Sequence, residues 1–375
     1  MMTTQKKQWN ASFSRMRSLA CVAIVVLHTC SYAMVAAHAK GTALSDAQVT
    51  LTSFGQYSCM WAVPLFVMAS GALLLDPERE LTWDRLLHRY IARVDGALFV
   101  FGLLFIAFDF AMNGVEETAA NSLFYVAHPG AGAGYVFLCC LVDLLTGHSW
   151  AHMWYLYMLV GLYLLLPFMK KVVAGSAEKD LLVLAGLLFV FTSVIPILGL
   201  FGVETDYRFS VATVYPLYFL LGNLLSSQTL KLPKWVALTG FVLATLFVWG
   251  YVWCAGGERP EWYGYVTSYN SIPIVAQATC LFSLLCRDDM EASPDGAPSS
   301  EENMQLSERC LLAFDHGTFG IYLIHLVFVK LAFRYAGLDP YASPAWFPLT
   351  VIAVVLLSWL VTWALQKLPL FRKIL

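Results

Sequence analysis

The chain has 375 residues, of which 59% are hydrophobic and only 13% are charged. Ordinary soluble domains carry about 25% charged residues, so this composition excludes a soluble globular enzyme. The formal net charge of −2 argues against nucleic acid as a partner, because the chain has no basic domain to neutralise phosphates.

Ten apolar runs are long enough to cross a membrane as helices, since about 20 residues span the hydrocarbon core. In chain order they are 18–36, 54–75, 94–112, 152–169, 181–201, 209–225, 235–254, 267–286, 317–337 and 346–366. Strand-sized alternation is absent, which excludes a porin-like barrel. The sequence therefore predicts an all-α polytopic integral membrane protein, a bundle of about ten transmembrane helices that forms a single domain over residues 1–375.

The distribution of basic residues tests this threading, because lysine and arginine collect on the cytoplasmic side of membrane proteins. With the N-terminus inside, the outer segments hold only a few of the 23 basic residues. These are Lys40, Arg208, Arg259, Lys330 and Arg334. An even number of spans then places both termini in the cytoplasm. The alternative of a cleaved signal peptide is disfavoured, because the first run is longer than the about 7–15 residues of a signal core.

Two connecting segments differ from the others. The outer segment 113–151 has no lysine or arginine, and its apolar stretch 135–145 is expected to form a re-entrant or interfacial helix. The inner segment 287–316 is rich in acids and contains the proline- and glycine-bearing run Ser293–Ser300. Such a composition cannot bury a core, so this segment is expected to be a flexible cytoplasmic loop.

An ionisable residue inside a span is costly to insert and is therefore a functional candidate, and His28 is the first of these. It follows Arg17 by eleven positions, which amounts to three helical turns plus about 20°, so both side chains project from one face. The rise of about 16 Å places Arg17 at the inner headgroup boundary and His28 near mid-bilayer. The alternative is a snorkelling arginine and a core histidine bonded to a neighbouring helix.

This arginine, ten residues and histidine resemble the first-helix motif of the acyltransferase-3 family of membrane O-acyltransferases. Three further stretches resemble later spans of that family: Val63–Gly71 the second, His152–Tyr157 with Gly161–Pro167 the fourth, and Gly320–His325 a late span. The resemblance covers nearly the whole chain. It is closest to members without a fused extra domain, such as the enterobacterial common antigen O-acetyltransferase type.

The resemblance implies acetyl transfer from cytoplasmic acetyl-CoA, as co-substrate, to a hydroxyl of an envelope or lipid-linked glycan. It also implies a multi-pass protein of the bacterial inner membrane, with His28 and Arg17 at the positions of the family's essential pair. His28 is suited to the role of general base, because the unperturbed pKa of imidazole, about 6.5, is near the working pH. General-base catalysis of this kind is typically worth about 10²–10⁴-fold.

Three arginines are candidates for binding the nucleotide end of CoA. Arg85, Arg89 and Arg93 follow the second span at i, i+4 and i+8, a spacing that predicts a basic stripe if the third helix begins early. The arginine fork binds phosphate bidentately. The alternative is that these residues follow from the positive-inside rule alone.

Other candidates accompany the essential pair. His325 lies about 12 Å into the ninth span and is expected either to approach His28 as a second acid/base or orienting group, or to be a satisfied core histidine. Ser70 is expected to donate a hydrogen bond or to allow close packing of helices. Trp154, Tyr155 and Tyr157 form either an aromatic belt or a platform that stacks an acceptor sugar.

No metal site is expected. The nine cysteines show no CxxC spacing, and His128, His148 and His152 lack ligand-like intervals. The competing function is a proton-coupled secondary transporter or exporter with His28, His325 and Asp109 as a proton path. A third possibility is a catalytically silent scaffold, which would tolerate replacement of His28.

Overall fold

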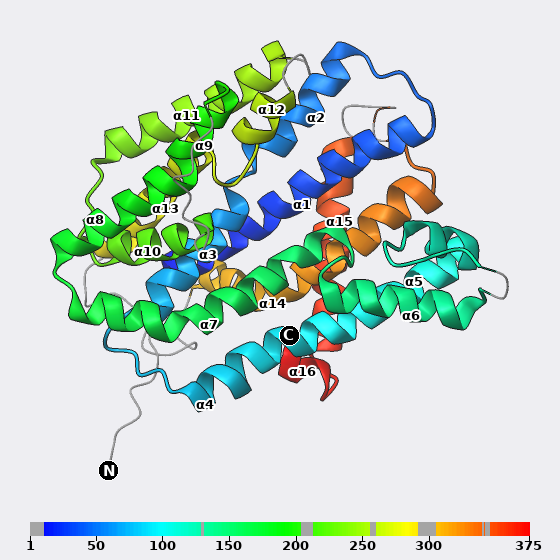
Figure 1. Cartoon of the computed structure of the whole chain (residues 1–375), viewed down its shortest axis with the longest axis horizontal. Coiled ribbons are helices and arrows are strands. Elements are labelled where there is room, and N and C mark those ends of the chain that lie inside the picture. The colour runs from blue at the N-terminus through cyan, green and yellow to red at the C-terminus, as the bar shows by residue number, and fades with distance from the viewer. Residues whose placement is uncertain are drawn as a thin grey trace. The chain divides into compact units, whose positions relative to one another are not determined.

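The computed structural model describes residues 11–128, 131–203, 213–255, 260–291, 305–339, 341 and 346–375 (Figure 1). Every regular element within these ranges is helical, and the prediction of an all-α protein is confirmed for this part of the chain. Apolar segments in a bilayer form helices because the helix satisfies each backbone hydrogen bond within the segment itself.

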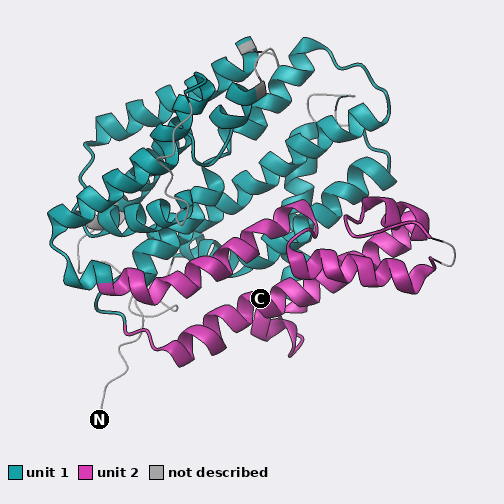
Figure 2. Ribbon diagram, in the orientation of Figure 1, with its two compact units in different colours: residues 1–79, 172–363 teal, residues 80–171, 364–375 magenta. Residues whose placement is uncertain are grey.

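The chain forms two compact units (Figure 2). Unit 1 consists of Met1–Arg79 and Val172–Trp363, and unit 2 consists of Glu80–Lys171 and Ala364–Leu375. Each unit therefore combines segments that are far apart in the sequence.

Unit 1 holds both histidines singled out as a possible pair. Its helices are α1 (Ala11–Ala39), α2 (Asp46–Ser58), α3 (Ala62–Leu74), α8 (Glu178–Phe189), η3 (Val190–Val194), α9 (Ile195–Leu200), α10 (Val214–Ser226), α11 (Lys234–Ala255), α12 (Pro260–Val266), α13 (Ile272–Glu291), α14 (Leu306–Lys330), η5 (Leu331–Tyr335) and most of α15 (Trp346–Leu365). Within this unit α1 contacts α2, α3, α13 and α14 (Figure 1). The core of unit 1 is therefore arranged around the first helix.

Helices α3 and α10 of unit 1 cross closely, at a glycine of each helix. A Cβ added at Gly71 of α3 would lie 2.0 Å from the backbone oxygen of Phe219, and one added at Gly222 of α10 would lie 2.0 Å from the backbone oxygen of Met68. Small residues allow membrane helices to approach in this way. The second-span motif Val63–Gly71 thus contributes a packing glycine.

Unit 2 contains α4 (Trp83–Arg85), η1 (Leu86–Ile91), α5 (Ala92–Asn121), α6 (Ala133–Thr146), η2 (Ala151–Met153), most of α7 (Trp154–Gly175) and α16 (Phe371–Ile374). Helix α6 ends at Gly147, whose left-handed conformation (φ 90°) suits glycine. The carboxylate of Asp143 accepts bonds from the Ser122 hydroxyl (2.5 Å) and the Leu123 amide (3.2 Å). These bonds fasten the end of α5 to α6.

The predicted spans correspond to observed helices. Eight helices or helix runs among the described residues are long and apolar enough to cross a membrane, and two shorter apolar helices, Val214–Ser226 and Ile272–Cys286, coincide with the sixth and eighth predicted runs. The protein is therefore a polytopic membrane protein. The apolar stretch 135–145, expected to be a re-entrant or interfacial helix, lies within α6.

Two predicted runs have different limits in the structure. The run 54–75 is divided into α2 and α3, because Pro64 fits the first turn of a helix but would clash with the preceding turn of a continuous one. The run beginning at 267 becomes helical only at Ile272, where the hydroxyl of Ser271 accepts a bond from the amide of Ile274 (3.4 Å). Capping and proline chemistry thus set boundaries that hydropathy alone does not locate.

The inner segment 287–316, expected to be a flexible loop, is helical at both ends. Helix α13 continues to Glu291, and α14 already begins at Leu306. A capping box explains the early start, because the side chains of Gln305 and Glu308 bond each other's backbone amides. The remainder of the predicted loop, 292–304, lies outside the described residues.

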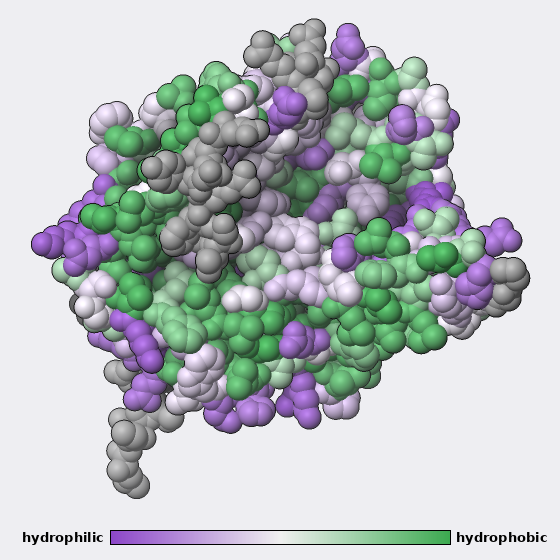
Figure 3. Space-filling view, viewed as in Figure 1, coloured by the Kyte–Doolittle hydropathy of each residue, from purple (hydrophilic) through white to green (hydrophobic). Residues whose placement is uncertain are grey.

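Large apolar side chains are exposed along several helices. On α6 they include Phe137, Leu138, Val142 and Leu145, and hydrophobic surface covers much of the visible part of this helix (Figure 3). Exposed apolar surface of this extent is unusual in water but is the normal lipid-facing surface of a membrane helix.

Candidate functional site

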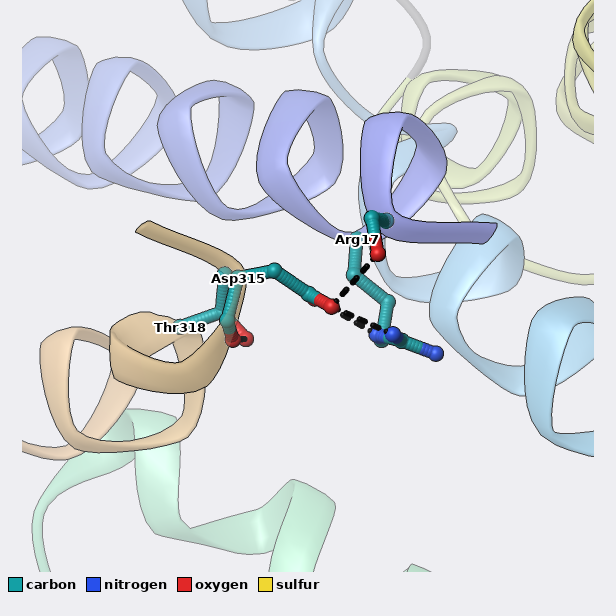
Figure 4. Close-up of polar contacts among 4 residues, drawn as sticks. Arg17, Asp315 and Thr318 are labelled. Atoms are coloured by element: carbon teal, nitrogen blue, oxygen red, sulfur yellow. Dashed lines mark hydrogen bonds and ion pairs between the residues drawn. The ribbon is translucent and has the colours of Figure 1, made fainter. Parts of the chain in front are cut away.

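An ion pair joins α1 and α14 in the N-terminal half of each helix. The Nε of Arg17 donates to Oδ1 of Asp315 (2.7 Å), and Nη2 donates to Oδ2 (2.5 Å), so the guanidinium binds the carboxylate bidentately (Figure 4). The hydroxyl of Ser14 donates a third bond to Oδ2 (2.8 Å). The side chain of Asp315 is only 4% exposed, whereas that of Arg17 is 31% exposed. The carboxylate is therefore enclosed by donors from α1, while the arginine retains a surface outside the pair.

A pair of histidines joins the same two helices farther along. Nδ1 of His28 lies 2.9 Å from Nε2 of His325, which is completely buried. Nδ1 of His325 lies 2.7 Å from the carbonyl oxygen of Tyr322 and 3.1 Å from that of Ile321. The structure thus brings together the two histidines that the sequence analysis singled out on separate spans.

These contacts determine the tautomers of a neutral pair. A carbonyl oxygen only accepts, so Nδ1 of His325 carries the hydrogen and its Nε2 carries a lone pair. That lone pair accepts a hydrogen bond from Nδ1–H of His28. The lone pair of His28 consequently lies on Nε2, the atom that a general base would use.

The two helices run parallel, with one constant register. Arg17 meets Asp315, Cys21 meets the carbonyl of Thr318 (3.6 Å between Sγ and O), and His28 meets His325. These partners are separated in sequence by 298, 297 and 297 residues, respectively. The ion pair and the histidine pair are therefore about 16 Å apart along one helix seam, at a rise of about 1.5 Å per residue.

Asp315 and Ser14 are the members of this arrangement that sequence reasoning missed. The expected loop 287–316 included Asp315 near its end, so the prediction did not place this carboxylate within a span or pair it with Arg17. A signal was present nonetheless, because Asp315 precedes His325 by almost the same interval as Arg17 precedes His28. Matching intervals on two parallel spans indicate two matching pairs.

Ser70 bonds within its own helix. Its hydroxyl donates to the carbonyl of Phe66 (2.9 Å), one turn earlier in α3. This is the usual partner of a serine inside a membrane helix. The packing role expected at this motif belongs to the neighbouring Gly71, which lies at the crossing with α10.

The three arginines of the expected stripe have different environments within unit 2. Arg89 is exposed, and the Nε of Arg85 has no hydrogen-bond partner. Arg93 donates to the backbone carbonyls of Ile374 (3.3 Å) and Leu375. The π-helical stretch η1 also lies between Arg85 and Arg93, so the α-helical spacing on which the stripe was predicted is interrupted.

The aromatic residues Trp154, Tyr155 and Tyr157 begin α7. Tyr155 is only 9% exposed, and the hydroxyl of Tyr157 donates to the carbonyl of Leu144 in α6. Trp154 and Tyr157 retain partly exposed surface. Among the described residues, no group of three or more histidine, cysteine, aspartate or glutamate side chains is arranged to hold a metal.

Comparison with known proteins identifies the family. A family model described as an acyltransferase domain matches residues 10–363, a range that begins just before α1 and ends within α15. Comparison with curated proteins and with solved structures finds no match. The matched range contains the whole seam of α1 and α14, including the ion pair and the histidine pair. The chain therefore belongs to the acyltransferase-3 family of membrane acyltransferases.

Proposed function

We propose that the protein transfers an acetyl group from acetyl-CoA to a hydroxyl of an envelope or lipid-linked glycan, in the bacterial inner membrane with both termini in the cytoplasm. The observation that carries the proposal is the histidine pair, in which His325 accepts a bond from Nδ1–H of His28. Membership of the family supplies the reaction class. Acetyl as the acyl group and a glycan as the acceptor rest on the resemblance of the sequence motifs.

In the proposed reaction, Nε2 of His28 takes the proton of the acceptor hydroxyl. The acceptor oxygen then attacks the acyl carbonyl carbon, and the bond from this carbon to its leaving group, the CoA thiolate in a direct transfer, breaks. The thiolate leaves with the bonding electron pair and receives the proton from the His28 imidazolium, which returns His28 to its neutral form. His325 orients the base, and its Nδ1–H, bonded to two backbone carbonyls, favours any positive charge that the pair shares.

The donor's phosphates are proposed to bind Arg85 and Arg89. Arg89 and Arg93 are both exposed, but Arg93 already donates to the backbone at Ile374 and Leu375, and Arg85 has an unpartnered Nε. Charge-assisted bonds from arginine to phosphate are strong because the fork is planar and permanently charged. Binding of the CoA nucleotide is therefore expected to depend on the first two arginines more than on the third.

Replacing Arg89 with glutamine is expected to raise the KM for acetyl-CoA about tenfold, the effect of losing one charge-assisted hydrogen bond of about 1.5 kcal/mol. The kcat should change little, because the substitution does not touch the histidine pair. The matched control is Arg93→Gln, which removes the same charge from the same helix run. Equal KM values for wild type and Arg89→Gln, with a raised KM for Arg93→Gln, would contradict this assignment.

The experiment that tests the function uses purified protein in nanodiscs with radiolabelled acetyl-CoA and an envelope glycolipid extract. We expect release of free CoA thiol that depends on the extract, together with label in the glycolipid fraction that mild base removes as acetate. Label in the glycolipid identifies a covalent transfer and provides an assay for purifying the acceptor. If no labelled product forms, and the same protein in sealed vesicles moves a solute across the membrane, the transporter alternative is favoured.

A further inference from the structure

Asp315 has a position that the proposed chemistry does not by itself explain. Its carboxylate is 4% exposed and accepts three hydrogen bonds, two from Arg17 and one from Ser14. All three donors belong to α1, while Asp315 belongs to α14. The carboxylate therefore links two helices that are far apart in the sequence, since Arg17 and Asp315 are separated by 298 positions.

The ion pair has the geometry needed to fix how far one helix lies along the other. A bidentate pair tolerates little displacement, because both N–H groups must stay aligned with both oxygens. Contacts between apolar side chains select one register less strongly than such a pair does. Within lipid, no hydrophobic driving force favours one register of two helices over another. Selection of register is the best-attested use of buried polar pairs.

The histidine pair depends on this register. His28 and His325 lie about three turns beyond the ion pair on the same two helices. The two histidines are 297 positions apart in the sequence, and Arg17 and Asp315 are 298 apart. A slip of one turn would displace the rings by about 5.4 Å, which removes a hydrogen bond of 2.9 Å. Correct orientation of His28 thus requires the register that Arg17 and Asp315 share.

We infer that Asp315 is a positioning residue, which binds Arg17 and thereby fixes the register of α1 and α14 that places His28 against His325. In this assignment Arg17 supports the reaction through Asp315 rather than by holding the donor. The inference rests on the proposed function only where activity is measured, because the register itself is a property of the fold.

A crosslink reports the register without any need for activity. Sγ of Cys21 lies 3.6 Å from the backbone carbonyl of Thr318, so the Thr318→Cys variant introduces a thiol on a residue whose backbone contacts the native one. A disulfide requires Cα atoms within about 7 Å, which a one-turn slip would prevent. We expect a small membrane-permeant oxidant to form this disulfide, detected by mass spectrometry of the joined peptides, and we expect its loss when Asp315→Asn is added.

The matched control for the crosslink is Ser14→Ala, which removes one bond from the same carboxylate but leaves the ion pair. The disulfide should form in this background as in wild type. If Asp315→Asn does not fold, the charge-reversed variant Arg17→Asp with Asp315→Arg carries the test, and it should form the disulfide. Equal disulfide yield with and without Asp315→Asn would overturn the inference, whatever the activity of the protein.

The kinetic arm separates positioning from donor binding. Asp315→Asn is expected to lower kcat about 10²-fold, the effect of a misplaced catalytic group, with the KM for acetyl-CoA nearly unchanged. The kcat of the charge-reversed variant should be about tenfold higher than that of Asp315→Asn, because the reversed pair can still hold the two helices in register. A raised KM in Arg17→Gln, with full kcat in Asp315→Asn, would show that Arg17 binds the donor instead. Absence of acetyl transfer in wild type would refute the proposed function but leave the crosslink result valid.

Discussion

Replacing His28 with alanine is expected to lower the rate of acetyl transfer by about 10²–10⁴-fold, the range for loss of a general base. The KM for acetyl-CoA should stay near the wild-type value, because the base acts on the acceptor hydroxyl and not on the nucleotide. The measurement is extract-dependent release of CoA thiol by purified protein, with label transfer to the glycolipid as the second readout. Unchanged turnover in His28→Ala would exclude His28 as the base, whereas a catalytically silent scaffold would show no turnover in either protein.

Variants at His325 distinguish a hydrogen-bond acceptor from a simple space-filling residue. His325→Gln places an amide oxygen where the lone pair of Nε2 accepts the bond from Nδ1–H of His28. His325→Leu has similar bulk and no acceptor. We expect His325→Gln to retain about tenfold more activity than His325→Leu, since the net contribution of one hydrogen bond, about 0.5–1.5 kcal/mol, is kept by glutamine and lost in leucine. Equal activity in the two variants would contradict the orienting role.

The second large effect concerns folding, at the crossing of α3 and α10. Gly71→Ala and Gly222→Ala are each expected to destabilise unit 1 by about 3 kcal/mol or more, at the upper end of overpacking effects. The added Cβ would lie 2.0 Å from a backbone oxygen of the other helix, and backbone cannot move aside as a flexible side chain can. The measurement is the yield of monodisperse protein in detergent together with its melting temperature.

The matched control is Gly186→Ala in α8 of the same unit. A Cβ there meets no atom within 4 Å, and the residue is exposed. Alanine is favoured over glycine within a helix by about 0.5–1 kcal/mol, so this variant should be as stable as wild type or slightly more stable. Wild-type stability in both Gly71→Ala and Gly222→Ala would mean that the helices do not approach this closely.

Much of the helical framework could be predicted from the sequence because its signals are local. A long apolar run must form a helix in a bilayer, so the run 18–36 predicts the middle of α1 without reference to any other segment. The predicted boundaries of the helices differ from the observed ones where a single residue sets the boundary. Pro64 divides one predicted run, and the capping box at Gln305 starts α14 earlier than the apolar pattern indicates.

The candidate site shows the same division. Arg17 and His28 lie on one helix, so helical periodicity alone places them on one face. Their partners lie about 300 positions away, and no local pattern states which carboxylate meets Arg17 or which ring meets His28. Asp315 falls at the end of the predicted loop 287–316, and a carboxylate that is exposed looks the same in a sequence as one that another helix encloses.

The sequence by itself determined that this protein is a helical membrane protein of the acyltransferase-3 family, with a cation and a titratable base on one face of its first helix. Hydropathy, periodicity and motif spacing suffice for this, since each is a property of neighbouring residues. Only the tertiary structure decided that Asp315 binds Arg17 and that His325 accepts a bond from His28. Those contacts depend on which helices are neighbours and on their register, and both are set by packing and hydrogen bonds between segments far apart in the chain.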